Sequence, residues 1–203
     1  MLDTEWVTAV AATPQKHVPK PEDDDDYRDL VPTGPTQPDP EVIPAPDIID
    51  QLPTKRLPSR TDGQHWYVAA HGGAGATTLA AMDENGGDAG NVWPINPDGQ
   101  NVIVVARETA TGLKAAQTLA RQWGSGVLPA VNLLALITIP SQPGRSPHSI
   151  ATAMKRTAGM YPRHYRANWN PQLLTVESHQ SEPTKADRKI IRLVTKLSAK
   201  ETR

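Results

Sequence analysis

A glycine-rich turn near the middle of the chain has the residue types of a phosphate-binding loop. Residues 70–78 read AHGGAGATT; they follow the apolar segment HWYVA and lead into LAAM. Consecutive glycines expose backbone N–H groups at the start of a helix, where the helix dipole also favours negative charge. The order of strand, glycine turn and helix predicts a phosphate or nucleotide site, with these candidate residues: His71, Gly72, Gly73, Ala74, Gly75, Ala76, Thr77 and Thr78.

The same turn lacks a side chain on which phosphate chemistry usually depends. A phosphate loop normally adds a lysine for the β- and γ-phosphates and a Ser or Thr for magnesium. Thr77 is the candidate magnesium ligand if a nucleotide binds, but residues 70–78 contain no lysine. Each charge-assisted hydrogen bond lost costs on the order of 1.5–3 kcal/mol. Two roles of the turn are therefore consistent with the sequence: weak nucleotide binding, or a purely structural role.

The turn resembles the deviant phosphate loop of the ParA/MinD family of ATPases, GKGGVGKTT. Its glycines and threonines match at Gly72, Gly73, Gly75, Thr77 and Thr78, while a glycine and two lysines are replaced by Ala70, His71 and Ala76. Residues 104–116 are similar to that family's strand and helix VTxPExxSLRDA, which adds Arg107 and Glu108 as candidate nucleotide-binding residues. The resemblance implies a truncated P-loop NTPase-like fold, with ATP or ADP and magnesium as the ligands to test.

The comparison with that family also predicts what is missing. Its adenine-binding asparagine has no counterpart in residues 133–140, and the 18 residues 83–100 stand, as an expected loop, where its magnesium-binding acidic strand belongs. Without the lysines and the carboxylates that phosphoryl transfer uses, we expect no efficient hydrolysis. The function predicted is a non-catalytic adaptor or regulatory protein on a degenerate ParA/MinD-like fold. A nucleotide-binding switch and a DNA-binding accessory protein are the alternatives.

A closer resemblance covers residues 66–169. The segments 71–79, 105–117, 122–126 and 143–145 are similar to landmarks of an uncharacterised actinobacterial family found on integrative and conjugative elements. This resemblance implies a protein of a mobile genetic element.

Other side chains were weighed as sites. Thr77, His71 and Glu108 would form a hydrolytic triad only if the fold brought them together. The six histidines have no metal-ligand spacing, and cysteine is absent. Basic residues at loop edges are candidates for nucleic-acid phosphates: Arg107, Arg145, Lys155, Arg156, Arg163 and Arg166. The aromatic residues Trp123, Tyr161, Tyr165 and Trp169 suit either base stacking or, more often, the core.

Composition divides the chain into three parts. Residues 1–61 hold 12 acids, 6 bases and 11 of the 20 prolines, which predicts a disordered acidic tail. Residues 62–178 have the length of one small domain, and residues 179–203 are basic. The acidic N-terminus does not resemble a secretory signal, and no apolar run is long enough to cross a membrane, so we expect a cytoplasmic protein.

Hydrophobic periodicity predicts a small parallel α/β sheet with flanking helices. Strands are expected over residues 65–70, 101–106, 131–139 and 164–167, and helices over residues 77–82, 109–123 and 148–158. Because parallel strands end at one edge of the sheet, the turns after residues 70, 106 and 139 should share a ligand-binding edge.

The C-terminal segment predicts a basic amphipathic helix. Thr184 and Asp187 form a capping pair, and an apolar stripe runs along residues 190–197. The stripe suits packing on the domain or on another helix. The basic residues suit DNA or an anionic membrane: Lys185, Arg188, Lys189, Arg192 and Lys196. A protein partner would be bound through the two tails.

Overall fold

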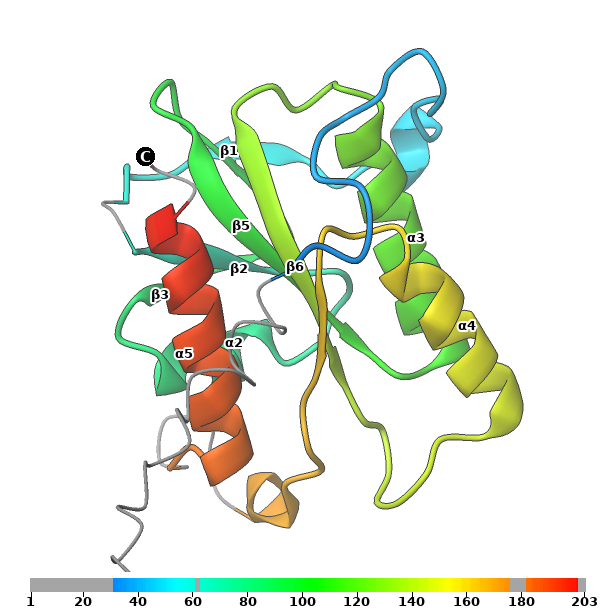
Figure 1. The fold of residues 1–203 in the computed structure, drawn as a ribbon, viewed down its shortest axis with the longest axis vertical. Coiled ribbons are helices and arrows are strands. Elements are labelled where there is room, and N and C mark those ends of the chain that lie inside the picture. Colours follow the sequence, from blue (N-terminus) through cyan, green and yellow to red (C-terminus); the bar gives the residue numbers. More distant parts are fainter. Residues whose placement is uncertain (1–30, 61–62, 176–181, 201–203) are drawn as a thin grey trace, which may run out of the picture.

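A five-stranded parallel sheet forms the centre of the molecule (Figure 1). The computed structural model describes residues 31–60, 63–175 and 182–200. The strands are β2 (His65–Ala69), β3 (Gly86–Gly90), β5 (Gln100–Arg107), β6 (Val131–Ile139) and β7 (His164–Arg166), in the order β3-β2-β5-β6-β7. The predicted α/β class with a parallel sheet and flanking helices is confirmed.

Helices cover both faces of the sheet, which explains the unbroken apolar runs of β5 and β6. On one face, Ile103 and Val105 pack with α2 (Ala76–Met82) and α5 (Lys185–Lys200). On the other face, Val102 and Val104 pack with α3 (Ala110–Gly124). The remaining helix, α4 (His148–Ala158), lies beside α3 (Figure 1). These helices agree with the predicted ranges to within one or two residues.

The chain reverses direction across the sheet between β2 and β5. From β2 the chain passes through α2 to β3 at one edge, then returns past β2 to β5 and continues to β6 and β7. The helix after β2 and the helix after β5 therefore cover opposite faces. In open parallel sheets, ligands bind outside the carboxyl ends of the strands at such a switch point.

Residues 83–100 are not the loop that their composition predicts. They contain β3, which pairs with β2, and the short strand β4 (Trp93–Ile95). Glycine is unfavourable in strands, but β3 requires it because aromatic rings of β2 occupy the space that a side chain would need. A Cβ at Gly86 would lie 2.3 Å from the Tyr67 ring, and one at Gly87 would lie 2.6 Å from the Trp66 ring. The aromatic side chains of β2 thus select glycines on the neighbouring strand.

Residues 31–60 follow a defined path along the domain, although composition places them in a disordered tail. They include a 3-10 turn, η1 (Ile48–Asp50), and strand β1 (Thr54–Arg56), which pairs with β4. The N–H of Thr33 donates to Pro162 O at 2.8 Å, and Gln122 on α3 exchanges two hydrogen bonds with the backbone of Leu52. Residues 1–30, the rest of the predicted acidic tail, lie outside the described residues.

The C-terminal helix packs its apolar stripe on the sheet. Ile190, Leu193, Val194 and Leu197 are buried in the same core cluster as α2. The predicted cap is confirmed, because Thr184 Oγ1 accepts from the N–H of Asp187 at 3.2 Å while Asp187 Oδ2 accepts from the N–H of Thr184 at 2.9 Å. Within the described residues, no helix has the length and apolar character needed to span a membrane.

Candidate functional site at the switch point

The glycine turn between β2 and α2 owes its shape to two left-handed residues. Gly73 has φ +74° and Gly75 has φ +102°, a region that side chains disfavour. A Cβ at Gly75 would also lie 2.5 Å from Cδ1 of Ile139 on β6. Gly72 has neither constraint, since a Cβ there would meet nothing within 4 Å. Gly73 and Gly75 therefore determine how the backbone of the turn is presented.

His71 joins the two loops that meet at the switch point. Its Nδ1 lies 2.9 Å from Gly72 O, and its Nε2 accepts from the backbone N–H of Arg107 at 3.1 Å. A backbone N–H can only donate, so the ring carries its proton on Nδ1. Gly112 leaves room for the ring, because a Cβ there would lie 2.7 Å from Nε2. His71 is thus a structural bridge between the loops after β2 and β5.

Thr77 is hydrogen-bonded to a carboxylate that the sequence analysis did not select. Its Oγ1 donates to Asp88 Oδ2 at 2.7 Å, and Asp88 Oδ1 accepts from the N–H of Gly90 at 2.8 Å. Asp88 lies on β3, directly beside the strand that leads into the turn. The expected loop is thus a strand that places one carboxylate beside the turn. A single acid in a glycine-rich run gave no periodic signal for that strand.

Arg107 supplies a cation to the turn. Its Nε donates to Gly73 O at 3.2 Å, and its Nη1 donates to Pro140 O at 2.9 Å. These bonds hold the guanidinium against the glycine turn at the carboxyl end of β5. Arg107 thus holds a positive charge beside the turn from the neighbouring strand.

Two adjoining pockets flank these residues. One, of about 300 Å³, is lined by the turn and α2 together with Gly90, Asn91 and Arg107. The other, of about 80 Å³, shares Gly75, Thr78 and Arg107 with it and extends to Trp169, Asn170 and Leu173. In this second pocket Asn170 is 8 % exposed, and its Nδ2 has no hydrogen-bond partner. A buried donor without a partner is rare in folded proteins.

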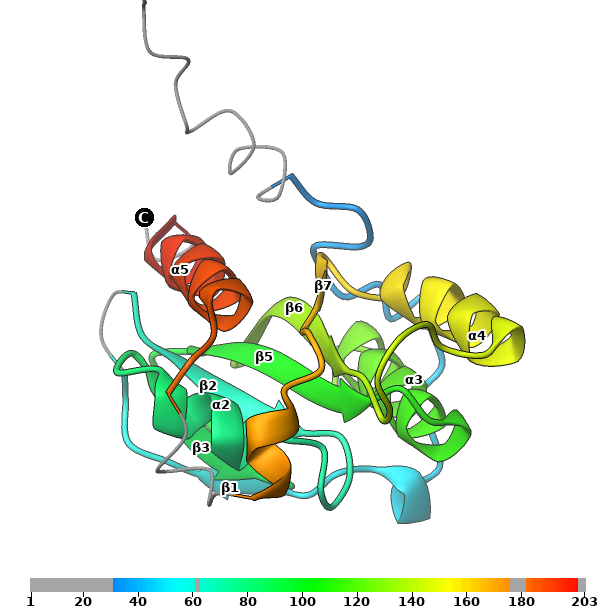
Figure 2. The same ribbon diagram turned by 90° about the horizontal axis from the view of Figure 1, so that it is seen from below.

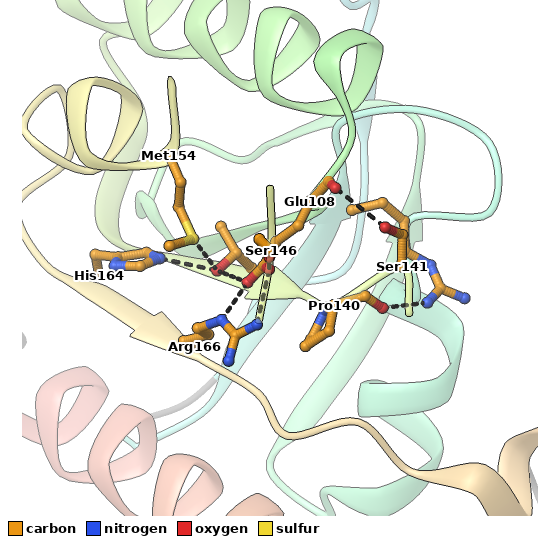
Figure 3. Close-up of polar contacts among 9 residues, drawn as sticks. Glu108, Pro140, Ser141, Ser146, Met154, His164 and Arg166 are labelled. Carbon is orange, nitrogen blue, oxygen red and sulfur yellow. Dashed lines mark hydrogen bonds and ion pairs between the residues drawn. The ribbon is translucent and has the colours of Figure 1, made fainter. Parts of the chain in front are cut away.

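The buried carboxylate of Glu108 points towards the exposed Arg166 on β7 and belongs to a separate polar network (Figure 3). Arg166 donates to both of its carboxylate oxygens, at 2.6 and 2.9 Å, and Ser146 Oγ donates to Oε2 at 2.5 Å. Burial alone would raise the pKa of Glu108, but the hydrogen bonds from Arg166 and Ser146 outweigh it and lower that pKa. The carboxylate is therefore ionised and fully occupied. Its predicted role in nucleotide binding is not supported by this orientation.

The same network holds the loop after β6. Ser141 Oγ donates to Glu108 O at 3.2 Å, and Thr138 Oγ1 lies 2.9 Å from Nε2 of His164 on β7 (Figure 3). Burial lowers the pKa of His164, so this ring is neutral at pH 7. The network holds the segment that contains Pro140. Because the carbonyl oxygen of Pro140 accepts a hydrogen bond from Arg107, the network also helps to fix Arg107 beside the glycine turn.

The suggested hydrolytic triad is not assembled. Thr77 bonds to Asp88, His71 bonds to the backbone of Arg107, and Glu108 bonds to Arg166. Among the described residues, no group of three or more histidines and acids is placed to hold a metal ion.

A second buried polar cluster, also missed from the sequence, ties α5 to β2. His65 Nε2 lies 3.0 Å from Asp83 Oδ2, which accepts from Tyr67 OH at 2.7 Å. Ser198 Oγ on α5 lies 3.1 Å from His65 Nδ1. The order Ser, His, Asp looks catalytic, but all three side chains are buried. This cluster is a structural link.

The remaining candidates are distributed over the molecule. Arg163 is buried and Arg166 binds Glu108, whereas Arg145, Lys155 and Arg156 are exposed. Trp123, Tyr161 and Tyr165 belong to the core, which is the role expected more often for such aromatic residues. Of these four described aromatic residues, Trp169 alone lines a pocket. On α5, Lys185, Arg188, Lys189, Arg192 and Lys196 are all exposed. The first four line a separate groove.

The fold and the site together define an α/β domain with a glycine turn at the switch point of a parallel sheet. A family model matches residues 63–190, which covers all five strands of the sheet. The chain belongs to this family, described as a family of unknown function (DUF6668). Neither the curated proteins nor the solved structures contain a match to the chain.

Proposed function

We propose that this protein is a non-hydrolysing regulatory protein that binds the phosphates of a nucleotide at its glycine turn. The observation that carries the proposal is the position of the 300 Å³ pocket, at the switch point and between the left-handed glycine turn and Arg107. The backbone N–H groups that begin α2 have no acceptor inside the helix and suit an anionic ligand. Arg107 provides the positive charge.

A divalent cation fits the same place. Thr77 and Asp88 offer a hydroxyl and a carboxylate, 2.7 Å apart, beside the phosphate-binding turn. Magnesium is typically bound by one or two protein oxygens together with waters and phosphate oxygens. When bound, it would neutralise phosphate charge. The arrangement supports Thr77 as a magnesium ligand and adds Asp88, on β3, as a second magnesium ligand.

The second pocket adds apolar surface from Trp169 and Leu173 beside the phosphate side. Its volume of about 80 Å³ is smaller than the roughly 150 Å³ that holds a benzene ring, so a base would contact only the mouth of this pocket. Because this pocket shares Gly75, Thr78 and Arg107 with the phosphate side, one ligand can contact both pockets.

Several features argue against efficient turnover. Among the described residues that line the two pockets, Arg107 is the one Lys or Arg side chain. Its guanidinium already donates hydrogen bonds to two carbonyl oxygens. Glu108, the other acid at the end of β5, is turned towards Arg166. Phosphoryl transfer needs groups that orient water and neutralise the developing charge, and this site is poor in both.

The proposed role is therefore that of a switch or adaptor whose bound state is read by a partner. We place it, from the resemblance to ParA/MinD proteins and to a family of conjugative elements, in the transfer or maintenance machinery of a mobile element. The N- and C-terminal segments are the proposed contacts with that machinery.

Calorimetric titration of the full chain with ATP, ADP and GTP, with magnesium, tests the proposal. We expect binding within the millimolar range and a roughly tenfold loss in Arg107→Ala, which removes one charge-assisted hydrogen bond. Arg107→Lys, which keeps the charge, should lose less. Arg121→Ala, an exposed arginine on α3, is the matched control and should bind as the wild type does. No heat at millimolar nucleotide, or equal affinity in both alanine variants, would contradict the proposal.

A further inference from the structure

A basic groove runs along α5, apart from the glycine turn. It has a volume of about 630 Å³ and is lined by Lys185, Arg188, Lys189 and Arg192 on the helix, with Asn168 after β7 on the other side. These four residues are spaced at i, i+3, i+4 and i+7, so they share one helical face. The opposite face is buried on the sheet. The groove is therefore a fixed surface of concentrated positive charge.

The described N-terminal segment is anchored just before β7, the strand that leads to this groove. Thr33 donates to Pro162 O at 2.8 Å, and Gly34 lies so close to Tyr161 O that a Cβ would be 2.2 Å away. Pro162 is followed by β7, which leads to Asn168 on the groove wall. Figure 2 shows the blue segment beside β7; it continues on the α3 side of the sheet, where the N–H of Asp39 donates to Gly124 O, whereas α5 covers the opposite side. The chain before Thr33 thus starts from a fixed point at the beginning of β7.

The segment before Thr33 carries the most acidic stretch of the sequence. Residues 22–26 read EDDDD, five consecutive acids, and they lie outside the described residues. Six residues separate Asp26 from Thr33, and the seven Cα–Cα steps between them span up to about 23–25 Å when the chain is extended. Asn168 is six residues beyond Pro162, at most about 20 Å away by the same measure. The acidic run can therefore reach the groove.

We propose that residues 22–26 dock into the basic groove of α5 within the same molecule. Five carboxylates complement four cations, and the short tether gives an effective concentration near the millimolar range. Because the groove is open to solvent, the contact is weak, reversible and sensitive to salt. Any other polyanion that binds the groove of α5 would then have to compete with residues 22–26 of the same chain.

Zero-length carbodiimide cross-linking of the full chain tests this docking, because it joins a carboxylate to an amine only when they touch. We expect cross-links from residues 22–26 to Lys185 or Lys189 in the monomer at about 50 mM salt, reduced several-fold at about 500 mM. Lys114 on α3 lies outside the groove and should give none. A local cross-link from Glu182 to Lys185 is a separate peptide and is distinguished by mass.

Two charge-neutralised variants complete the test. Replacing Glu22 by Gln and Asp23, Asp24, Asp25 and Asp26 by Asn should abolish the groove cross-links. The matched control neutralises the acids Asp39, Glu41, Asp47 and Asp50 and should keep them. Absence of groove cross-links at low salt, or their presence only in dimers, would overturn the proposal. Equal binding of a single-stranded oligonucleotide by wild type and the first variant would also overturn it, because it would assign the groove to nucleic acid.

Discussion

The ring of His71 accepts a hydrogen bond from the backbone N–H of Arg107, with 3.1 Å between Nε2 and the amide nitrogen. This bond joins the glycine turn after β2 to the loop after β5, the two loops on either side of the switch point. It also positions the backbone of Arg107, whose side chain reaches back to Gly73 O. The shape of the proposed phosphate pocket thus depends on a side chain that replaces a lysine of the ParA/MinD motif.

Gly112→Ala should disrupt this bridge. The new Cβ would lie 2.5 Å from Arg107 O and 2.7 Å from His71 Nε2, so the ring or the backbone must move. We expect a loss of about 1–3 kcal/mol in the free energy of unfolding, measured by urea denaturation. Gly72→Ala is the control, because its Cβ meets nothing within 4 Å, and it should change stability by less than about 0.5 kcal/mol. Equal stabilities of the two variants would show that the bridge is loose.

Glu108→Gln should make stability less dependent on pH. The pKa of Glu108 is lowered in the folded protein, chiefly by Arg166 and Ser146 acting against burial. The ionised carboxylate therefore stabilises the fold above its unfolded pKa of about 4.3, and this contribution is lost as pH falls through the lower, folded pKa.

Urea denaturation of wild type and Glu108→Gln at neutral and acid pH measures this difference. At pH 7 we expect the variant to be less stable by about 1.5–3 kcal/mol, the value of hydrogen bonds to a charged group. The gap should shrink as pH falls below about 4. Glu84→Gln, at an exposed site, serves as the control. A gap that stays constant over this pH range would mean that the Glu108 charge does not stabilise the fold.

Tyr67→Phe and Asp83→Asn should not act independently. Tyr67 OH donates to Asp83 Oδ2 at 2.7 Å in a buried cluster with His65. A double-mutant cycle on the free energy of unfolding should give a coupling of about 1 kcal/mol or more, since both variants remove the same bond. Additive effects, within about 0.5 kcal/mol, would mean that the two side chains are energetically separate.

Magnesium should strengthen nucleotide binding only while Thr77 and Asp88 are both present. Titrations with excess magnesium and with EDTA should differ in affinity for the wild type and agree for Thr77→Val and Asp88→Asn. Thr118→Val is the matched control, because its hydroxyl bonds only to Lys114 O on the exposed side of α3. Retained magnesium dependence in Thr77→Val would remove that hydroxyl from the proposed cation site.

The parts of the fold that follow hydrophobic periodicity were predictable. The ranges of β6 and α4 agree with the prediction residue for residue, and α3 is shifted by one residue. The apolar residues of the helices repeat with the helical period, and β6 is a short unbroken apolar run, as expected of a strand covered on both faces. β3 was not predictable, because its sequence GGDAG has no strand period. Its glycines are selected by the rings of Trp66 and Tyr67, a contact that no local pattern reveals.

The candidate site was predictable only where its residues are consecutive in the sequence. The turn and Arg107 were identified, but Asp88, Asn91 and Asn170 come from separate segments and meet at the site only through the fold. The orientation of Glu108 was unpredictable for the opposite reason. It is adjacent to Arg107 in the sequence, yet alternation along the end of β5 turns it towards β7 and Arg166.

The most direct test of the account is an NMR titration of the ¹⁵N-labelled full chain with magnesium and ADP. The account predicts that the amide signals of Gly73, Gly75 and Thr77 shift, together with those of Arg107 and the side-chain amide of Asn170. Signals of residues on α4, which lies away from both pockets, should stay in place. No shift at millimolar ADP, or shifts confined to the basic face of α5, would contradict nucleotide binding at the glycine turn.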